Sequence, residues 1–113
     1  MEAVGIVLNI DASQVAEFEQ GFRNHELPIW EDFVGRGIML HASLTKMDIS
    51  TQPVEGAVQY LISVAFAGSE GHHLHDSDPR FQAWNEMADA YQIAPPIVTG
   101  GEVIISAGEA TET

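Results

Sequence analysis

Two kinds of hydrophobic spacing alternate along the chain, and their order constrains the fold more than any other feature. Residues 3–10, 38–47, 57–66 and 102–107 read as β-strands, with apolar side chains at alternate positions. After the first strand and again after the third, apolar residues recur every three or four positions, as in amphipathic helices. The predicted order is β-α-β-β-α-β, a ferredoxin-like α+β fold. In that fold a four-stranded antiparallel sheet carries two helices on one face.

The predicted helices have recognisable starts and ends. Asp11, with Gln14 three residues later, predicts the start of the first helix, and Pro28 is expected to interrupt it. Asp78 followed by Pro79 predicts the start of the second helix. Pro95 and Pro96 are expected to end it, and Gly100 and Gly101 to precede the last strand. The buried faces are predicted to be Val15, Phe18 and Phe22 in the first helix, and Phe81, Trp84, Ala88 and Tyr91 in the second.

The length and charge of the chain limit what it can be. Its 113 residues fit a single domain, placed at 1–108, with 109–113 as a frayed tail. No basic leader, no apolar run long enough for a bilayer and no cysteine are present, which favours a cytoplasmic location. Seventeen acidic residues against four basic ones give a net charge of −13, which disfavours nucleic acid and anionic membranes as partners. Neutral or apolar ligands remain compatible with this charge.

The face of the sheet that points away from the helices is predicted to be unusually apolar. Strict alternation assigns to it Val7, Met39, Met47, Leu61, Ala65 and Ile104. A sheet face open to water is normally polar, so we expect this face to be covered. No further element of the chain is left to cover it. The sequence therefore predicts a homodimer in which a second copy covers the face.

The element order and a short HELP motif (His25–Pro28) at the end of the first helix resemble the dimeric α/β-barrel superfamily. That group includes antibiotic-biosynthesis monooxygenases, stress-responsive barrel proteins and muconolactone isomerases. The resemblance implies a pocket for a small, often aromatic molecule, and oxygen chemistry that needs no cofactor. Asn9 and Trp84 occupy places comparable to an asparagine and a tryptophan that recur in the monooxygenase branch. Haem-degrading members carry a histidine where this chain has Ala94 and prolines, so it departs from their pattern.

His41 is the predicted catalytic base, since a neutral imidazole in mid-strand can accept a proton near neutral pH. The alternative is a hydrogen-bonded interface histidine. Asn9 is the second catalytic candidate, as a donor to a substrate oxygen, although it could instead satisfy a backbone group at the strand end. Trp84 could be a pocket wall or plain core, and His25 could reach the pocket mouth or cap its helix. The predicted substrate-binding residues are Met39, Ser43, Gln59, Leu61, Ser63, Trp84, His25 and Ile104.

The segment GHHLHDSDPRFQAW (Gly71–Trp84) places three histidines and two aspartates directly before a helix start. In an extended chain His73 and His75 would project to the same side, as two metal ligands should, and Asp76 and Asp78 could add oxygen ligands. The spacing matches no closed zinc motif. The alternative is a polar collar, with Asp78 as the helix cap and His72, His73 and His75 solvated in a loop. We assign no metal and no cofactor to the chain.

Two function hypotheses follow. The first is a cofactor-independent monooxygenase or isomerase that acts on a small apolar or aromatic compound, with His41 as base and Asn9 and Ser63 as orienting groups. The second is a non-catalytic stress-response or ligand-binding module with the same cavity. A metal-binding protein built on the segment from His72 to Asp78 is a third reading.

Overall fold

The computed structural model describes residues 1–108, and the predicted tail at 109–113 lies outside the described residues. The strands are β1 (Glu2–Asp11), β2 (Met39–Lys46), β3 (Ala57–Phe66) and β4 (Gln92–Glu102). The helical segments are η1 (Ala12–Gln14), α1 (Val15–Gly21), η2 (Phe22–Glu26), α2 (Leu27–Gly35), α3 (Gly71–Asp76) and α4 (Pro79–Asp89). None of the described helices is long and apolar enough to cross a membrane.

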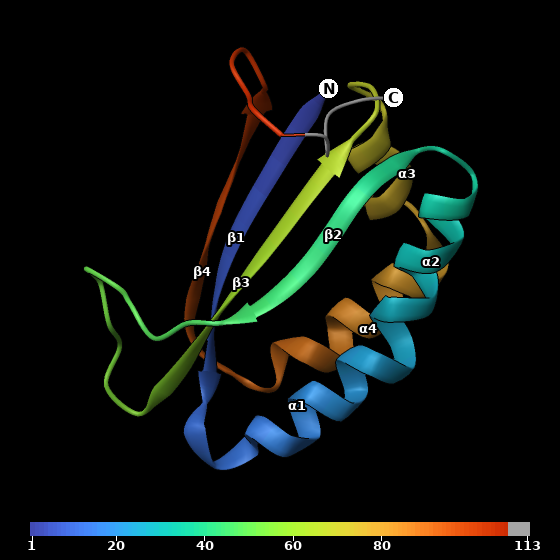
Figure 1. Ribbon diagram of the computed structural model, residues 1–113. Helices are drawn as coiled ribbons and strands as arrows, with labels where there is room; N and C mark the ends of the chain where they lie inside the picture. Colours follow the sequence, from blue (N-terminus) through green and yellow to red (C-terminus); the bar gives the residue numbers. More distant parts are fainter. Residues whose placement is uncertain (109–113) are drawn as a thin grey trace.

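The four strands form one antiparallel sheet in the order β2-β3-β1-β4, and the helices pack against one face of it (Figure 1). Val4 pairs with Val64 and Ile6 with Ile62, which places all four side chains on the face toward the helices. The ferredoxin-like α+β fold predicted from the sequence is confirmed.

The first helical region runs without a break from Val15 to Gly35, so the predicted interruption at Pro28 is wrong. Proline lacks an N–H, and its ring clashes with the carbonyl four residues earlier in a regular α-helix. In this chain the segment η2 just before it is π-helical, and the N–H of Leu27 donates to the carbonyl of Phe22, five residues back. Pro28 then occupies the first turn of α2, directly after this wider turn. The wider turn lets the chain continue.

The last strand was predicted at 102–107, and the structure places it at Gln92–Glu102 instead. Helix α4 already ends at Asp89, and Pro95 and Pro96 lie inside the strand. A sheet tolerates proline at an edge, where the missing donor would face solvent, and β4 is an edge strand. The pairing of β4 with β1 also shifts between Val7 and Asn9, opposite the two prolines.

A register shift near the start of β2 overturns one predicted side-chain direction. Met39 pairs with Phe66, whereas His41 pairs with Ala65, the next residue of β3. The extra residue, Leu40, is part of a bulge, so Met39 and His41 lie on opposite faces of the sheet. Met39 is 1% exposed in the core, and Leu40 is exposed. Strict alternation had assigned Met39 and Leu40 the reverse way.

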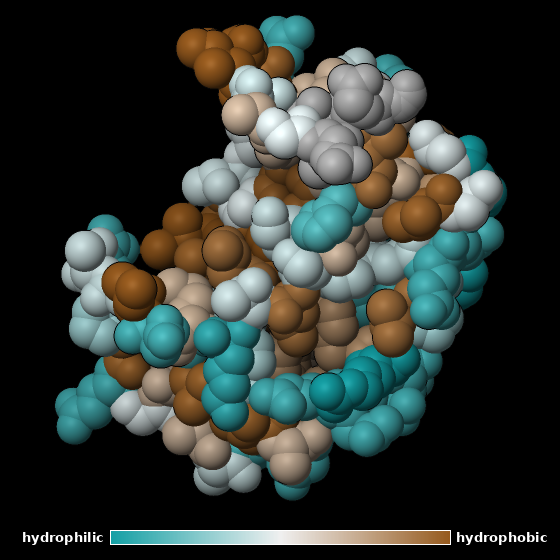
Figure 2. All heavy atoms as spheres, in the orientation of Figure 1, coloured by the Kyte–Doolittle hydropathy of each residue, from teal (hydrophilic) through white to brown (hydrophobic). Residues whose placement is uncertain are grey.

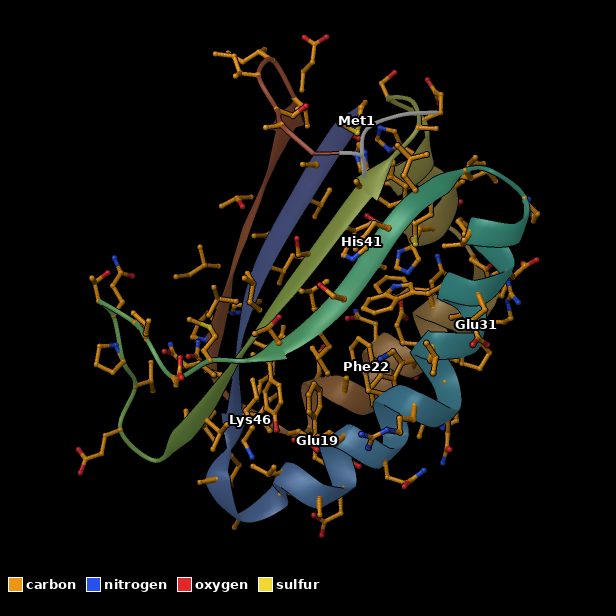
Figure 3. All side chains as sticks on the ribbon, viewed as in Figure 1. Met1, Glu19, Phe22, Glu31, His41 and Lys46 are labelled. Atoms are coloured by element: carbon orange, nitrogen blue, oxygen red, sulfur yellow. The ribbon has the colours of Figure 1, made fainter. Side chains whose placement is uncertain are left out.

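The core lies between the sheet and the helices, and both predicted helical stripes contribute to it. Phe18 is fully buried, and its ring contacts the rings of Phe22, Tyr60, Trp84 and Tyr91. Trp84 and Ala88 of α4 are buried as predicted, while Val15, Phe81 and Tyr91 are partly buried against the same cluster. Figure 3 labels Phe22 in the space between the helices and the sheet.

Candidate functional site

A cavity of about 670 Å³ lies between the helix-facing side of the sheet and the helices. That volume is in the range of protein sites for small organic molecules. Its wall is built from strands of the sheet and from the helical segments that cover it. Its apolar lining is Val4, Ile6, Leu8, Ile10, Phe18, Phe22, Trp30, Met39, Ile62, Val64, Phe66, Phe81, Trp84, Ala88, Pro96 and Val98.

Aromatic rings form much of this wall, and the helix sequence positions them. Trp30 and Trp84 each meet Phe22 edge to face, with ring centroids 5.1 and 6.1 Å apart. Trp84 comes this close to α1 because residue 21 is glycine: a Cβ there would lie 2.8 Å from the indole. The cavity therefore offers flat, polarisable surfaces to a ligand.

An acid–histidine pair also lines the cavity. The Nε2 atom of His75, in α3, lies 2.6 Å from Oε2 of Glu26, in η2. The Nδ1 atom of the same imidazole lies 3.1 Å from the carboxylate of Asp76. Glu26 is 3% exposed, and its other oxygen, Oε1, is buried without a hydrogen-bond partner. The pair thus leaves one buried acceptor unused.

The surroundings of His75 hold its ring in place. The rings of Phe33 and Phe81 lie 5.9 and 4.3 Å from it, centroid to centroid. Burial lowers the pKa of His75, but the hydrogen bond and charge of Glu26, with those of Asp76, outweigh it and the net shift is upward. His75 is therefore cationic over a wider pH range than a free histidine.

A second acid–histidine pair lies in the same lining. Nδ1 of His72 is 2.7 Å from Oε1 of Glu2, at the start of β1. Both side chains are partly exposed, so this pair is more solvated than the pair of Glu26 and His75. Asn85, Asp89, Gln92, Thr99 and Gly100 complete the cavity lining.

The histidine-rich segment is not an extended loop, because Gly71–Asp76 forms the short helix α3. His73 is exposed, while His72 and His75 turn toward different acids. Over residues 1–108, no three His, Cys, Asp or Glu side chains converge as a metal site would require. The predicted capping role is confirmed: Asp78 accepts a hydrogen bond from the backbone N–H of Arg80, with Pro79 as the first residue of α4.

Most of the predicted site residues lie on the far face of the sheet, away from this cavity. His41 is exposed there on β2 (Figure 3). It lies in the same row as Ala65, where a row is a set of residues that are paired across neighbouring strands, and Ser43 pairs with Ser63 in the next row. Leu61 occupies the row after that, opposite Thr45 and Val7.

Asn9 and Gln59 are buried at one end of that face and bond to each other. The Nε2 of Gln59 donates to Oδ1 of Asn9 at 2.8 Å and to the carbonyl of Gln52 at 3.0 Å. The Nδ2 of Asn9 donates to the carbonyl of Pro95 at 3.1 Å, where β4 shifts register. The geometry matches the alternative in which Asn9 satisfies backbone groups.

The remaining predicted residues divide between the cavity and the surface. Met39 and Trp84 line the cavity, and Trp84 is also core. His25 is exposed, and its ring stacks on Trp84 with centroids 5.4 Å apart. Ile104 follows the end of β4 and is 83% exposed.

Sequence reasoning missed Glu26 and assigned His75 only to a metal or loop role. One signal for Glu26 was present. Phe18, Phe22, Glu26 and Trp30 follow one another at intervals of four residues and therefore share one helix face. Glu26 is thus a carboxylate on a face that is otherwise aromatic and buried. His75 lies 49 residues further on, and no local pattern links it to Glu26.

The sequence matches no family model and no protein of curated function. Solved structures do resemble the chain. A protein from Nitrosomonas europaea, whose name proposes an antibiotic biosynthesis monooxygenase, has a TM-score of 0.73 at 8% identity, covering 95% of this chain and 93% of that one. The chain has the ferredoxin-like fold of the antibiotic biosynthesis monooxygenase-like proteins.

Two further structures agree. A crystal structure titled antibiotic biosynthesis monooxygenase has a TM-score of 0.69 at 13% identity, with 93% of this chain and 100% of that one covered. An uncharacterised NIPSNAP domain protein from Burkholderia xenovorans has a TM-score of 0.66 at 15% identity, with 95% and 96% covered. At these identities the likeness concerns the fold, and activity has to be argued from the site.

Proposed function

We propose that the protein binds a small, largely apolar, uncharged molecule of aromatic type in the cavity between its sheet and its helices. The observation that carries the proposal is the cavity of about 670 Å³ with an aromatic and aliphatic wall. Burial of a ligand there removes apolar surface from water on both sides, which favours binding. The acidic lining residues Glu2, Asp76 and Asp89 disfavour anionic ligands.

A variant that fills the cavity tests the proposal. Ala88→Leu enlarges a buried side chain of the wall, and Ala83→Leu makes the same change at an exposed position of α4 outside the lining. With 2-methoxynaphthalene as probe, calorimetry is expected to show binding to the wild type and to Ala83→Leu. Ala88→Leu should bind at least about tenfold more weakly. Equal affinity in all three proteins contradicts the proposal, and so does a wild type that binds neither this ether nor 2-naphthol.

The second part of the proposal is a homodimer formed through the far face of the sheet. Three rows of that face contain no Asp, Glu, Lys or Arg, in a chain with a net charge of −13. Those rows are His41, Ala65, Ala3 and Gly101; Ser43, Ser63, Gly5 and Thr99; and Thr45, Leu61, Val7 and Ile97. Small and apolar side chains let two sheets approach closely, and no like charges oppose the contact.

The surface beside that face supports the same assembly. Hydrophobic side chains gather over β4 and over the segment that follows it, whereas hydrophilic side chains dominate over the helices (Figure 2). The exposed apolar residues of this region outside the cavity lining are Ile93, Ile97, Ile104 and Ile105. Exposed apolar surface of this kind is typical of an interface. Light scattering in solution checks the dimer directly.

The reaction that we propose for this apolar cavity is oxygenation of a hydroxylated aromatic ring without a cofactor. In such a step dioxygen accepts four electrons from the ring: one oxygen atom becomes the new carbonyl of a quinone and the other leaves as water. Oxygen uptake with hydroxylated polycyclic aromatics tests this activity. Binding without uptake would favour the non-catalytic ligand-binding module instead. A cytoplasmic setting belongs to the same proposal and is supported by the lack of cysteine.

A further inference from the structure

We propose that the unpaired carboxylate oxygen of Glu26 binds the hydroxyl group of a neutral aromatic ligand, so that the cavity selects phenol-like molecules over the corresponding ethers. This inference rests on the ligand-binding cavity proposed above and adds the chemical group that the cavity recognises. It concerns an acid that the sequence did not single out.

The unpaired oxygen is the central observation. Oε1 of Glu26 is buried and has no hydrogen-bond partner, while the residue lines the cavity. A buried acceptor without a partner costs free energy, and native structures rarely leave one. An ionised carboxylate can only accept hydrogen bonds, so the missing partner must be a donor. Because the residue lines the cavity, we infer that a small shift of the Glu26 side chain lets a ligand hydroxyl reach Oε1 and supply that donor.

The rest of the carboxylate is fixed by protein groups. Oε2 of Glu26 lies 2.6 Å from Nε2 of His75, and the other nitrogen of that ring is held by Asp76. The rings of Phe33 and Phe81 pack against the imidazole and restrict its movement. The carboxylate is therefore largely held in place before a ligand arrives, which lowers the ordering cost of binding.

The charge around Glu26 selects among donors. The described lining contains no lysine or arginine. An anionic ligand would be repelled by the four carboxylates of the lining, and only the histidines could offset part of that repulsion; the carboxylates are Glu2, Glu26, Asp76 and Asp89. A cationic amine would lose its hydration on entering a cavity whose lining is mostly apolar, and this desolvation cost does not arise for a neutral hydroxyl. A neutral hydroxyl avoids both penalties.

The aromatic lining of the cavity favours a particular skeleton for the ligand. Six aromatic side chains line the cavity, namely Phe18, Phe22, Trp30, Phe66, Phe81 and Trp84. Such surfaces favour edge-to-face and offset contacts with an aromatic ring. The predicted ligand class is therefore an uncharged aromatic compound of one to a few rings that carries at least one free hydroxyl group.

Titration calorimetry with three probes of one skeleton tests the inference: 2-naphthol, 2-methoxynaphthalene and (2-naphthylmethyl)ammonium. The wild type is expected to bind 2-naphthol at least about tenfold more tightly than the ether, since hydrogen bonds to charged groups exceed neutral ones. It should also bind 2-naphthol more tightly than the ammonium. In Glu26→Met the preference for naphthol over the ether should fall below about twofold, while the ether still binds.

Two further variants keep the test decisive. Glu31→Met makes the same substitution at an exposed glutamate of the next helical turn (labelled in Figure 3), outside the cavity lining, and should keep the preference. If Glu26→Met does not fold by circular dichroism, Glu26→Gln replaces it. Gln keeps the shape of the side chain but offers only a neutral acceptor, so the preference should drop several-fold.

The outcomes separate the two proposals. Equal binding of naphthol and ether by the wild type overturns the role of Glu26 and leaves the ligand-binding cavity intact. A preference that survives in the Glu26 variants, or tighter binding of the ammonium, also overturns it. Failure of all three probes to bind contradicts the ligand-binding cavity itself, and the role of Glu26 falls with it.

Discussion

Glu26 and His75 are 49 residues apart in the chain, yet a carboxylate oxygen of the first lies 2.6 Å from Nε2 of the second in the wall of the cavity. The contact joins the π-helical segment η2 to the short helix α3. Their side chains are only 4% and 11% exposed, so water screens the pair poorly. This pair makes stability depend on pH.

The pKa of His75 is raised in the folded state above the value of 6.5 for a free histidine. A raised pKa means that the folded protein binds the proton more tightly than the unfolded chain. The stabilisation is complete below about pH 6.5 and is lost as the pH rises through the folded-state pKa. Urea unfolding from about pH 5.5 to about pH 9 should show the free-energy difference between the wild type and His75→Gln shrinking with rising pH. His73→Gln, at an exposed position of the same helix, should show no such trend, and a flat difference for His75→Gln would refute the prediction.

Tyr60 of β3 and Glu19 of α1 connect the sheet to the first helix. The Tyr60 hydroxyl donates to Oε2 of Glu19 at 2.5 Å, and Nζ of Lys46 lies 3.9 Å from the same oxygen (Glu19 and Lys46 are labelled in Figure 3). Tyr60→Phe should lower the free energy of unfolding by about 1 kcal/mol, the typical net value of a hydrogen bond, because the Glu19 side chain is partly exposed. Tyr91→Phe, at a half-buried position, serves as the control in the same urea titration. A loss for Tyr60→Phe no larger than for the control would show that the bond adds nothing.

Asp78 is the N-cap residue of α4 and is held in place by several contacts. Its carboxylate accepts from the backbone N–H and the guanidinium of Arg80, whose hydrogen bonds lower the pKa of Asp78 to about 2. Asp78→Ala should cost about 1 kcal/mol at neutral pH, as for other N-cap residues. Because the folded pKa is depressed, this stabilisation is present above pH 3.8 and disappears as the pH falls through about 2. Thermal unfolding of Asp78→Ala and of the exposed Asp48→Ala at about pH 7 and about pH 2.5 checks both statements, since the cost of Asp78→Ala should be smaller at about pH 2.5, where part of the stabilisation is already lost. Equal effects of the two variants at neutral pH would contradict the first statement, and an undiminished cost at about pH 2.5 the second.

Gly21 lets α1 pack against the indole of Trp84. A Cβ at residue 21 would lie 2.8 Å from two atoms of that buried ring, so the ring or the helix must move. Gly21→Ala should therefore destabilise the protein by about 1–3 kcal/mol, although alanine is the better helix former. Gly35→Ala, at the end of α2, meets no atom within 4 Å and should be neutral or slightly stabilising. Urea unfolding of the two variants checks the contrast, and a loss of stability no larger for Gly21→Ala than for Gly35→Ala would contradict it.

Ile97 is 42% exposed on the far face of the sheet, in the row of Leu61 and Val7. If two copies meet there, Ile97→Lys buries an unpaired charge and should weaken the dimer at least about tenfold. Val34→Lys, on the exposed side of α2, introduces the same charge away from that face. Light scattering across a concentration series should show dissociation for Ile97→Lys only. A wild-type protein that stays monomeric at high concentration would rule out the dimer.

Three strands and both main helices could be predicted because one side of each is buried. The segment at 57–66 was predicted with the observed bounds, since its apolar residues alternate regularly. β4 was missed for the opposite reason: nearly all its residues are exposed at the sheet edge, and prolines and glycines interrupt it. Helix α3 has six residues, half of them histidine, and no apolar repeat that could reveal it.

The site was less predictable than the fold. One extra residue at Leu40 reversed the faces expected for Met39 and Leu40, and a bulge leaves no clear mark in the sequence. The contact between Glu26 and His75 depends on how α3 packs against η2, which is a tertiary relationship. The sequence identified His75 as chemically interesting, but only the folded chain shows which acid it meets.

The two prolines of β4 have a consequence beyond this chain's own packing. An edge strand with free N–H and C=O groups can recruit another strand and extend into fibrils. Adjacent N–H groups of an extended strand point to opposite edges, so one of the two residues Pro95 and Pro96 removes a donor from the open edge of the outermost strand. The two prolines that kept β4 from being recognised in the sequence therefore also protect this edge of the sheet from aggregation.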